Sequence, residues 1–240
     1  MDGRRLHWIE TGRGRPVVLL HGLGHSAQAW GHVVPALARR RRVLAVDLPG
    51  FGHSEASPRR PLLEGYAHVV AEWLQAVAGG PATVVGHSMG GSTAAHLAAS
   101  RPDLLSGVVL VAPAGIVGTP AWWRIVLVQR HVRQLLAPAL LVSRPALNRA
   151  SVALGYRWIG FHGLDRSSLD HIRAFSSGLG TRKEIAALLE TAEALVTSLA
   201  APAPHVPPGL PGLVIWGRRD RLVPSAHAPA VAERSGARVG

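Results

Sequence analysis

A serine between two glycines gives the clearest chemical signal in this sequence of 240 residues. The window GHSMG at residues 86–90, with Ser88 at its centre, follows the apolar run 83–85 and precedes a helical pattern over 92–99. A sharp strand-to-helix turn needs small residues on both sides, and it presents the serine hydroxyl at a helix amino terminus, where negative charge is stabilised. The window predicts a serine nucleophile, against the alternative of a glycine-rich turn with an incidental serine.

The elements that must hold this turn are visible as short apolar runs that alternate with helical patterns. The runs are unbroken by polar residues, as in strands buried on both faces. We expect a mostly parallel, doubly wound α/β sheet with an edge strand at 6–10. The other predicted strands are 16–20, 43–46, 82–85, 107–111 and 212–216, and the predicted helices are 27–38, 66–78, 92–99 and 225–234.

A long stretch in the second half of the sequence interrupts this alternation. Residues 115–208 show only helical patterns cut by Pro and Gly, and they end in the proline-rich stretch 200–211. We therefore predict that 1–114 and 209–240 build one sheet domain and that 115–208 is a helical insertion.

Composition excludes several classes of protein. The sequence has no Cys, so disulfide scaffolds, Cys-based zinc sites and thiol nucleophiles are excluded. The net charge of +12 comes from 26 basic residues, but no nucleic-acid motif accompanies it, and we expect no nucleic-acid partner. No metal-binding motif such as H-E-x-x-H is present, so we expect no metal. The sequence shows neither a signal peptide nor an apolar run long enough to span a membrane, which predicts a cytoplasmic location.

Four segments, each at the end of an apolar run, resemble the α/β-hydrolase family, and the resemblance is closest to its serine esterases and lipases. The resemblance implies that the insertion is the family's cap, placed after the sixth strand, and that no cofactor is used. The segments are HG at 21–22, DLPGFGHS at 47–54, GHSMGG at 86–91 and WGRRDRLVP at 216–224.

The resemblance also implies a role for each motif residue. Ser88 would form an acyl-enzyme, the backbone N–H groups of Leu23 and Met89 would hold the oxyanion, and Asp220 would orient a histidine base. Asp47 would be structural and would bond the backbone of its own turn. The residues that would support the loops are His21, Gly22, Gly86, His87 and Gly90.

The base histidine of the triad is not found in this sequence. In the family it follows the acid after one more strand, but only 20 residues follow Asp220, and their one histidine, His227, lies in a predicted helix. We expect the last strand to be truncated at Gly240 and this chain to be nearly inactive, whereas a chain extended through a Gly-His would be active. His25 is a weak substitute. We interpret four further histidines as solvated or packed in or beside the insertion: His131, His162, His171 and His205.

The predicted substrate is a small or medium apolar acyl ester. Residues 122–158 contain six Arg and no acidic residue, interleaved with Trp and aliphatic side chains. This pattern fits either an ordinary cap with solvated Arg or a face that contacts anionic membrane surfaces, in which case the substrate is a lipid ester. Alternatives within the fold are C–C hydrolase, thioesterase and perhydrolase chemistry. A further alternative is an inactive protein that binds a ligand under its cap.

Overall fold

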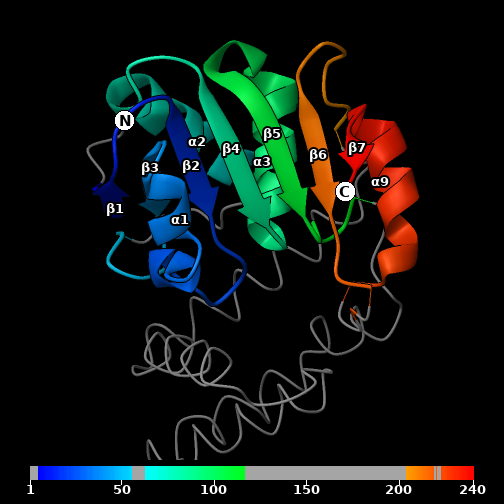
Figure 1. Ribbon diagram of the computed structural model, residues 1–240, viewed down its shortest axis with the longest axis horizontal. Coiled ribbons are helices and arrows are strands. Elements are labelled where there is room, and N and C mark those ends of the chain that lie inside the picture. Colours follow the sequence, from blue (N-terminus) through cyan, green and yellow to red (C-terminus); the bar gives the residue numbers. More distant parts are fainter. Residues whose placement is uncertain (1–4, 56–62, 117–203, 219, 221–222) are drawn as a thin grey trace, which may run out of the picture.

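The computed structural model describes residues 5–55, 63–116, 204–218, 220 and 223–240. Its centre is a seven-stranded sheet in the order β1-β3-β2-β4-β5-β6-β7 (Figure 1). β1 pairs antiparallel with β3 and every other pair is parallel, which confirms the predicted sheet and its edge strand. The strands are β1 (Trp8–Thr11), β2 (Pro16–Leu20), β3 (Arg42–Val46), β4 (Ala82–His87), β5 (Leu105–Val111), β6 (Gly212–Ile215) and β7 (Arg238–Val239).

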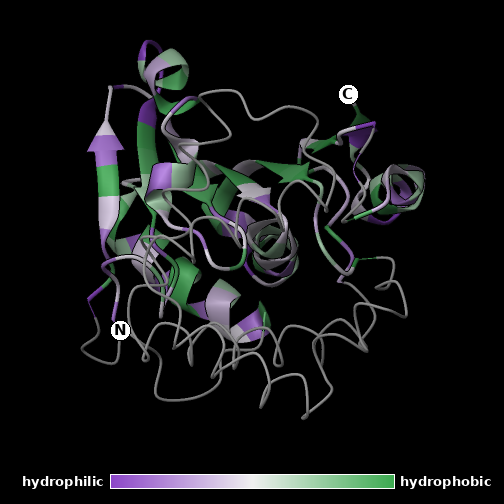
Figure 2. Ribbon diagram, turned by 90° about the horizontal axis from the view of Figure 1, so that it is seen from below, coloured by the Kyte–Doolittle hydropathy of each residue, from purple (hydrophilic) through white to green (hydrophobic). Residues whose placement is uncertain are grey.

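The inner strands form because their side chains are buried on both faces of the sheet. The last four residues of β2 and of β3 are all buried. In Figure 2, which views the molecule from the edge where the parallel strands end, the middle of the sheet is mainly hydrophobic. Two apolar clusters result: one joins the sheet to α1, and the other joins it to α2, α3 and α9.

Helices cover both faces of the sheet, as the doubly wound prediction requires. In Figure 1, α2 and α3 lie behind the sheet and α1 lies in front of it. The α-helices are α1 (Val34–Ala38), α2 (Leu63–Val77), α3 (Met89–Ser100) and α9 (Ala228–Ser235), and the 3-10 helices are Ala27–Trp30, Pro102–Leu104 and Ser225–His227.

The prediction of one continuous helix over 27–38 is wrong. A 3-10 helix ends at Trp30, a turn follows, and α1 begins at Val34. Gly31 favours this break, and Pro35, which has no N–H to donate, lies in the first turn of α1 instead of the interior of a longer helix.

The predicted insertion lies almost entirely outside the described residues, which stop at 116 and resume at 204. Its placement after a sixth strand needs correction, because five described strands, β1 to β5, precede residue 115. The sequence itself predicts five strands before that point, the edge strand 6–10 and four apolar runs, and only the family resemblance implied a sixth. The arginine-rich stretch 122–158 is likewise outside the described residues.

The expected final strand is present as β7. Arg238 and Val239 lie opposite Leu213 and Val214 of β6 in a parallel register, and the N–H of Gly240 donates to the Val214 carbonyl at 3.0 Å. In the described ranges, none of the helices combines the length and apolar character that a membrane crossing requires.

Candidate active site

Ser88 occupies a strained turn between β4 and α3. Its φ of 52° and ψ of −117° lie outside the regions that non-glycine residues prefer, at a cost of roughly 1–3 kcal/mol. Hydrogen bonds to the segment at the end of β5 hold the turn: the Ser88 N–H donates to the Val111 carbonyl at 3.0 Å, and its carbonyl accepts the Ala114 N–H at 3.2 Å. The fold therefore stabilises a backbone conformation that leaves the Ser88 side chain partly exposed.

Two glycines make this turn possible. A Cβ on Gly86 would lie 2.1 Å from the carbonyl oxygen of Gly90, and a Cβ on Gly90 would lie 2.3 Å from that of Leu20. Both distances are too short for any side chain, so β2, β4 and the start of α3 approach this closely only with glycine at positions 86 and 90.

The loop after β2 lies against Ser88. β2 and β4 are parallel neighbours, and a Cβ on Gly22 would lie 3.3 Å from the Ser88 Cβ and 3.2 Å from Nδ1 of His87. Among the backbone hydrogen bonds that the described residues make outside their helices and strands, none uses the N–H of Leu23 or Met89. The two expected oxyanion donors therefore belong to segments that meet at the serine.

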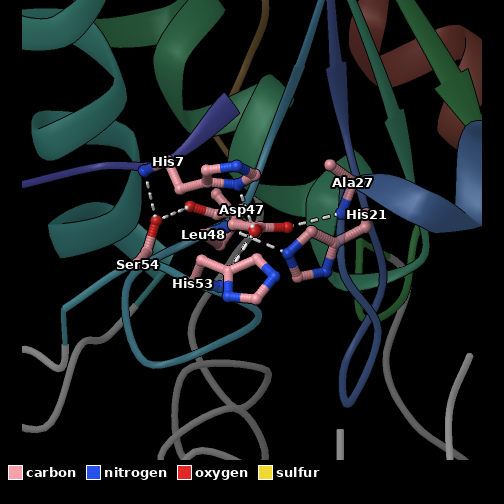
Figure 3. Close-up of polar contacts among 7 residues, drawn as sticks. All are labelled: His7, His21, Ala27, Asp47, Leu48, His53 and Ser54. Atoms are coloured by element: carbon pink, nitrogen blue, oxygen red, sulfur yellow. Dashed lines mark hydrogen bonds and ion pairs between the residues drawn. The ribbon is translucent and has the colours of Figure 1, made fainter. Parts of the chain in front are cut away.

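His21 connects this loop to the turn after β3 (Figure 3). Its ring is 1% exposed, Nδ1 donates to the Gly22 carbonyl at 2.8 Å, and Nε2 accepts the Leu48 N–H at 3.0 Å. Burial lowers the pKa of His21 to about 4, and the hydrogen bond to Gly22 opposes this only in part. The neutral ring is thus a structural link between two loops.

This link predicts an acid-sensitive fold. Because the pKa of His21 is about 4 in the folded protein and near 6.5 in the unfolded chain, only the unfolded chain binds the proton between these values. Stability is unaffected above pH 6.5 and falls as the pH drops, by about 2 kcal/mol at pH 5 from this group. We expect His21→Gln to lose that part of the pH dependence. Urea unfolding at pH 7 and pH 5 measures the free energy of unfolding of both proteins. If wild type and His21→Gln lose the same amount between these pH values, His21 is not the group responsible.

Asp47 makes hydrogen bonds both within its own turn and beyond it. Its carboxylate accepts the N–H of His53 in that turn at 3.0 Å, as expected. It also accepts the Ala27 N–H at 2.6 Å and pairs with Nδ1 of His7 at 2.7 Å. The prediction of bonding within its own turn is therefore too narrow, since these two partners are 20 and 40 residues away in sequence.

Asp220 lies in the loop after β6. Its N–H donates to the Gly217 carbonyl at 3.0 Å, and its Oδ1 accepts the Val223 N–H at 2.9 Å. Trp216 donates from Nε1 to the Val223 carbonyl at 2.8 Å, which ties the two ends of the loop together. The half-buried carboxylate is thus fixed at the same sheet edge as Ser88.

Two strand spacings separate the elements that carry the serine and the acid. β5 lies between β4 and β6, and strands are about 4.8 Å apart, so the chain positions are roughly 10 Å apart in the sheet plane. That gap suits one intervening side chain that contacts both groups, as an imidazole does in a serine triad.

The remaining histidines lie in varied places. His25 is partly exposed in the loop after β2, His205 is exposed, and His227 ends a 3-10 helix and precedes α9. Outside the described residues lie His131, His162 and His171. In the described part of the chain, no cluster of three or more His, Asp or Glu residues is arranged to hold a metal ion.

Comparison with known proteins agrees with this geometry. A family model described as alpha/beta hydrolase fold matches residues 15–130. The pimeloyl-[acyl-carrier protein] methyl ester esterase of Aeromonas hydrophila subsp. hydrophila is 33% identical over 93% of this chain and 84% of its own length. A crystal structure of an alpha/beta hydrolase fold protein from Burkholderia ambifaria superposes with a TM-score of 0.79 at 24% identity, covering 100% of this chain and 88% of that one.

The chain belongs to the α/β-hydrolase fold family. It is also 30% identical, over 95% of its residues, to the dihydrolipoyllysine-residue acetyltransferase component of the acetoin cleaving system of Pseudomonas putida. The chain spans 58% of the length of that relative.

Proposed function

We propose that this protein is a serine hydrolase that cleaves a carboxylic ester of a small or medium apolar acyl group through an acyl-enzyme on Ser88. The observation that carries the proposal is the strained Ser88 turn, which hydrogen bonds to the end of β5 hold in place. The loop after β2 lies so close to it that a Cβ added to Gly22 would be 3.3 Å from the Ser88 Cβ. The relative from Aeromonas hydrophila, named as a methyl ester esterase, supports an ester as the bond cleaved.

The mechanism uses the groups that meet at this edge of the sheet. Ser88 Oγ attacks the ester carbonyl carbon and gives its proton to a histidine base, while the N–H groups of Leu23 and Met89 hold the oxyanion. Each such donor contributes about 3 kcal/mol in comparable enzymes. The alkoxide takes that proton from the histidine as it leaves. Water then attacks the acyl carbon, giving its proton to the same histidine, and the acid leaves as Ser88 regains its proton.

We propose that a chain continuing past β7 would supply the base histidine, with Asp220 as its partner. β7 runs parallel beside β6, and the loop after β6 carries Asp220, so a segment extending from β7 heads toward the same edge of the sheet. A serine hydroxyl without a base attacks slowly at neutral pH, because loss of a triad member costs several orders of magnitude.

The test compares residues 1–240 with a chain that continues through a Gly-His after β7, on p-nitrophenyl acetate, butyrate and octanoate. We expect the longer chain to turn over at least about 10³-fold faster than residues 1–240. Comparable turnover by both would contradict the position of the base. A folded longer chain that hydrolyses none of the esters would contradict ester hydrolysis and favour ligand binding.

A further inference from the structure

A buried carboxylate beside the site has no part in the acyl-transfer mechanism. Asp47 follows the last residue of β3 and is 1% exposed. Its Oδ2 accepts the His53 N–H and pairs with His7, whereas its Oδ1 accepts the Ala27 N–H (Figure 3). Hydrogen bonds to a buried charged group are shorter and stronger than neutral ones, and the Ala27 bond, at 2.6 Å, is among the shortest around this carboxylate.

The next residue holds the other end of the same loop. The Leu48 N–H donates to Nε2 of His21 at 3.0 Å, and the opposite nitrogen of that ring donates to the Gly22 carbonyl. Two consecutive residues, Asp47 and Leu48, therefore fix the loop 21–27 at its last and first residues (Figure 3).

The proposed oxyanion donor lies between these two anchors. Leu23 is two residues from His21 and four from Ala27, and the intervening turn is closed by the His25 N–H, which donates to the Gly22 carbonyl at 3.2 Å. An oxyanion donor must be placed closely, because a misplacement of about 1 Å costs on the order of 10²-fold in rate. The hydrogen bonds at His21 and at Ala27 restrain the loop on both sides of Leu23, as such placement requires.

We propose that Asp47 is a positioning residue for the loop 21–27, which carries the proposed oxyanion donor Leu23. It acts through its hydrogen bond to Ala27, and His7 supports its other oxygen. The proposal rests on the proposed function for its catalytic consequence, but its structural part does not. His7 precedes β1 and its side chain is 40% exposed, so two hydrogen bonds connect a surface histidine to the loop beside Ser88.

The test measures hydrogen–deuterium exchange by mass spectrometry on the full chain. We expect Asp47→Ala to raise exchange in the peptide covering 21–30 by about tenfold or more, with exchange in 84–95 unchanged. The matched control is Ser54→Ala, which removes a hydroxyl that bonds the Asp47 carbonyl and the His7 N–H but not the carboxylate. Exchange at 21–30 that stays at the wild-type rate in Asp47→Ala would overturn the proposal.

A second variant keeps the test decisive if Asp47→Ala does not fold. Ala27 is the first residue of a 3-10 helix and Ser26 before it is extended, so proline fits this backbone and removes the N–H that Asp47 accepts. We expect Ala27→Pro to raise exchange at 21–30 as Asp47→Ala does, and the double variant to add little to either. Wild-type exchange in Ala27→Pro, or full additivity in the double variant, would overturn the proposal.

The catalytic consequence is measured separately, as hydrolysis of p-nitrophenyl butyrate by the chain that continues through a Gly-His after β7. We expect Asp47→Ala to lower kcat by about 10- to 100-fold with KM within about twofold, because the oxyanion forms only in the transition state. Faster exchange with unchanged kcat in an active enzyme would overturn the positioning role. A folded wild-type longer chain without esterase activity would instead contradict the proposed function, and the exchange measurement would still decide whether Asp47 holds the loop.

Discussion

In a chain that carries the histidine base, replacing Ser88 with alanine is expected to lower kcat/KM for ester hydrolysis by about 10⁴- to 10⁶-fold while leaving the protein folded. The substitution removes the one oxygen that would form the acyl bond. It keeps a Cβ in the same backbone conformation, which is held by hydrogen bonds of the Ser88 main chain and not of its hydroxyl. The free energy of unfolding should change by no more than about 0.5 kcal/mol, since the side chain is only half-buried.

The matched control is Ser100→Ala at the other end of α3. The Ser100 hydroxyl donates to the His96 carbonyl at 2.8 Å and is exposed, so its loss should leave kcat/KM unchanged. Mass spectrometry after rapid quenching should show an acyl adduct on the peptide containing residue 88 in wild type and in Ser100→Ala. A Ser88→Ala enzyme with more than a few per cent of wild-type activity would show that another group is the nucleophile.

The sheet could be predicted from the sequence because its strands are buried on both faces. Such strands consist of consecutive apolar residues, as in Val43–Val46, where all four side chains are buried, and no other common element explains runs this short. The segment 27–38 could not be predicted as well. Its apolar residues fit a helix, but Gly31 and the tertiary contacts of Trp30 with the sheet decide where the turn falls.

The site shows the same division between local and tertiary information. The Ser88 turn is local, since Gly86 and Gly90 are needed within four residues of each other, and their spacing between an apolar run and a helical pattern indicates it. The hydrogen bonds that Asp47 makes outside its own turn are not local. Its partners at Ala27 and His7 depend on how β3 is placed beside β2 and β1, which no pattern around residue 47 encodes.

Asp220→Asn is expected to lower kcat by roughly 10³- to 10⁴-fold in the protein that carries its histidine base, without unfolding the loop. An asparagine retains the oxygen that accepts the Val223 N–H at 2.9 Å, and the Trp216 bond to the Val223 carbonyl is untouched, so the loop keeps its shape. What is lost is the negative charge that stabilises an imidazolium and holds its ring in the productive tautomer.

The control for Asp220 is Asp103→Asn, the same change at an exposed carboxylate that pairs with the guanidinium of Arg101 at 2.7 Å. That surface pair contributes little to stability and lies at the end of β5 opposite Ser88, since Asp103 precedes that strand and Ser88 bonds to its last residue. Activity should therefore be unchanged in Asp103→Asn. If Asp220→Asn also retains wild-type kcat, the carboxylate serves only the loop, through Val223, and the acid of the triad must come from another strand end.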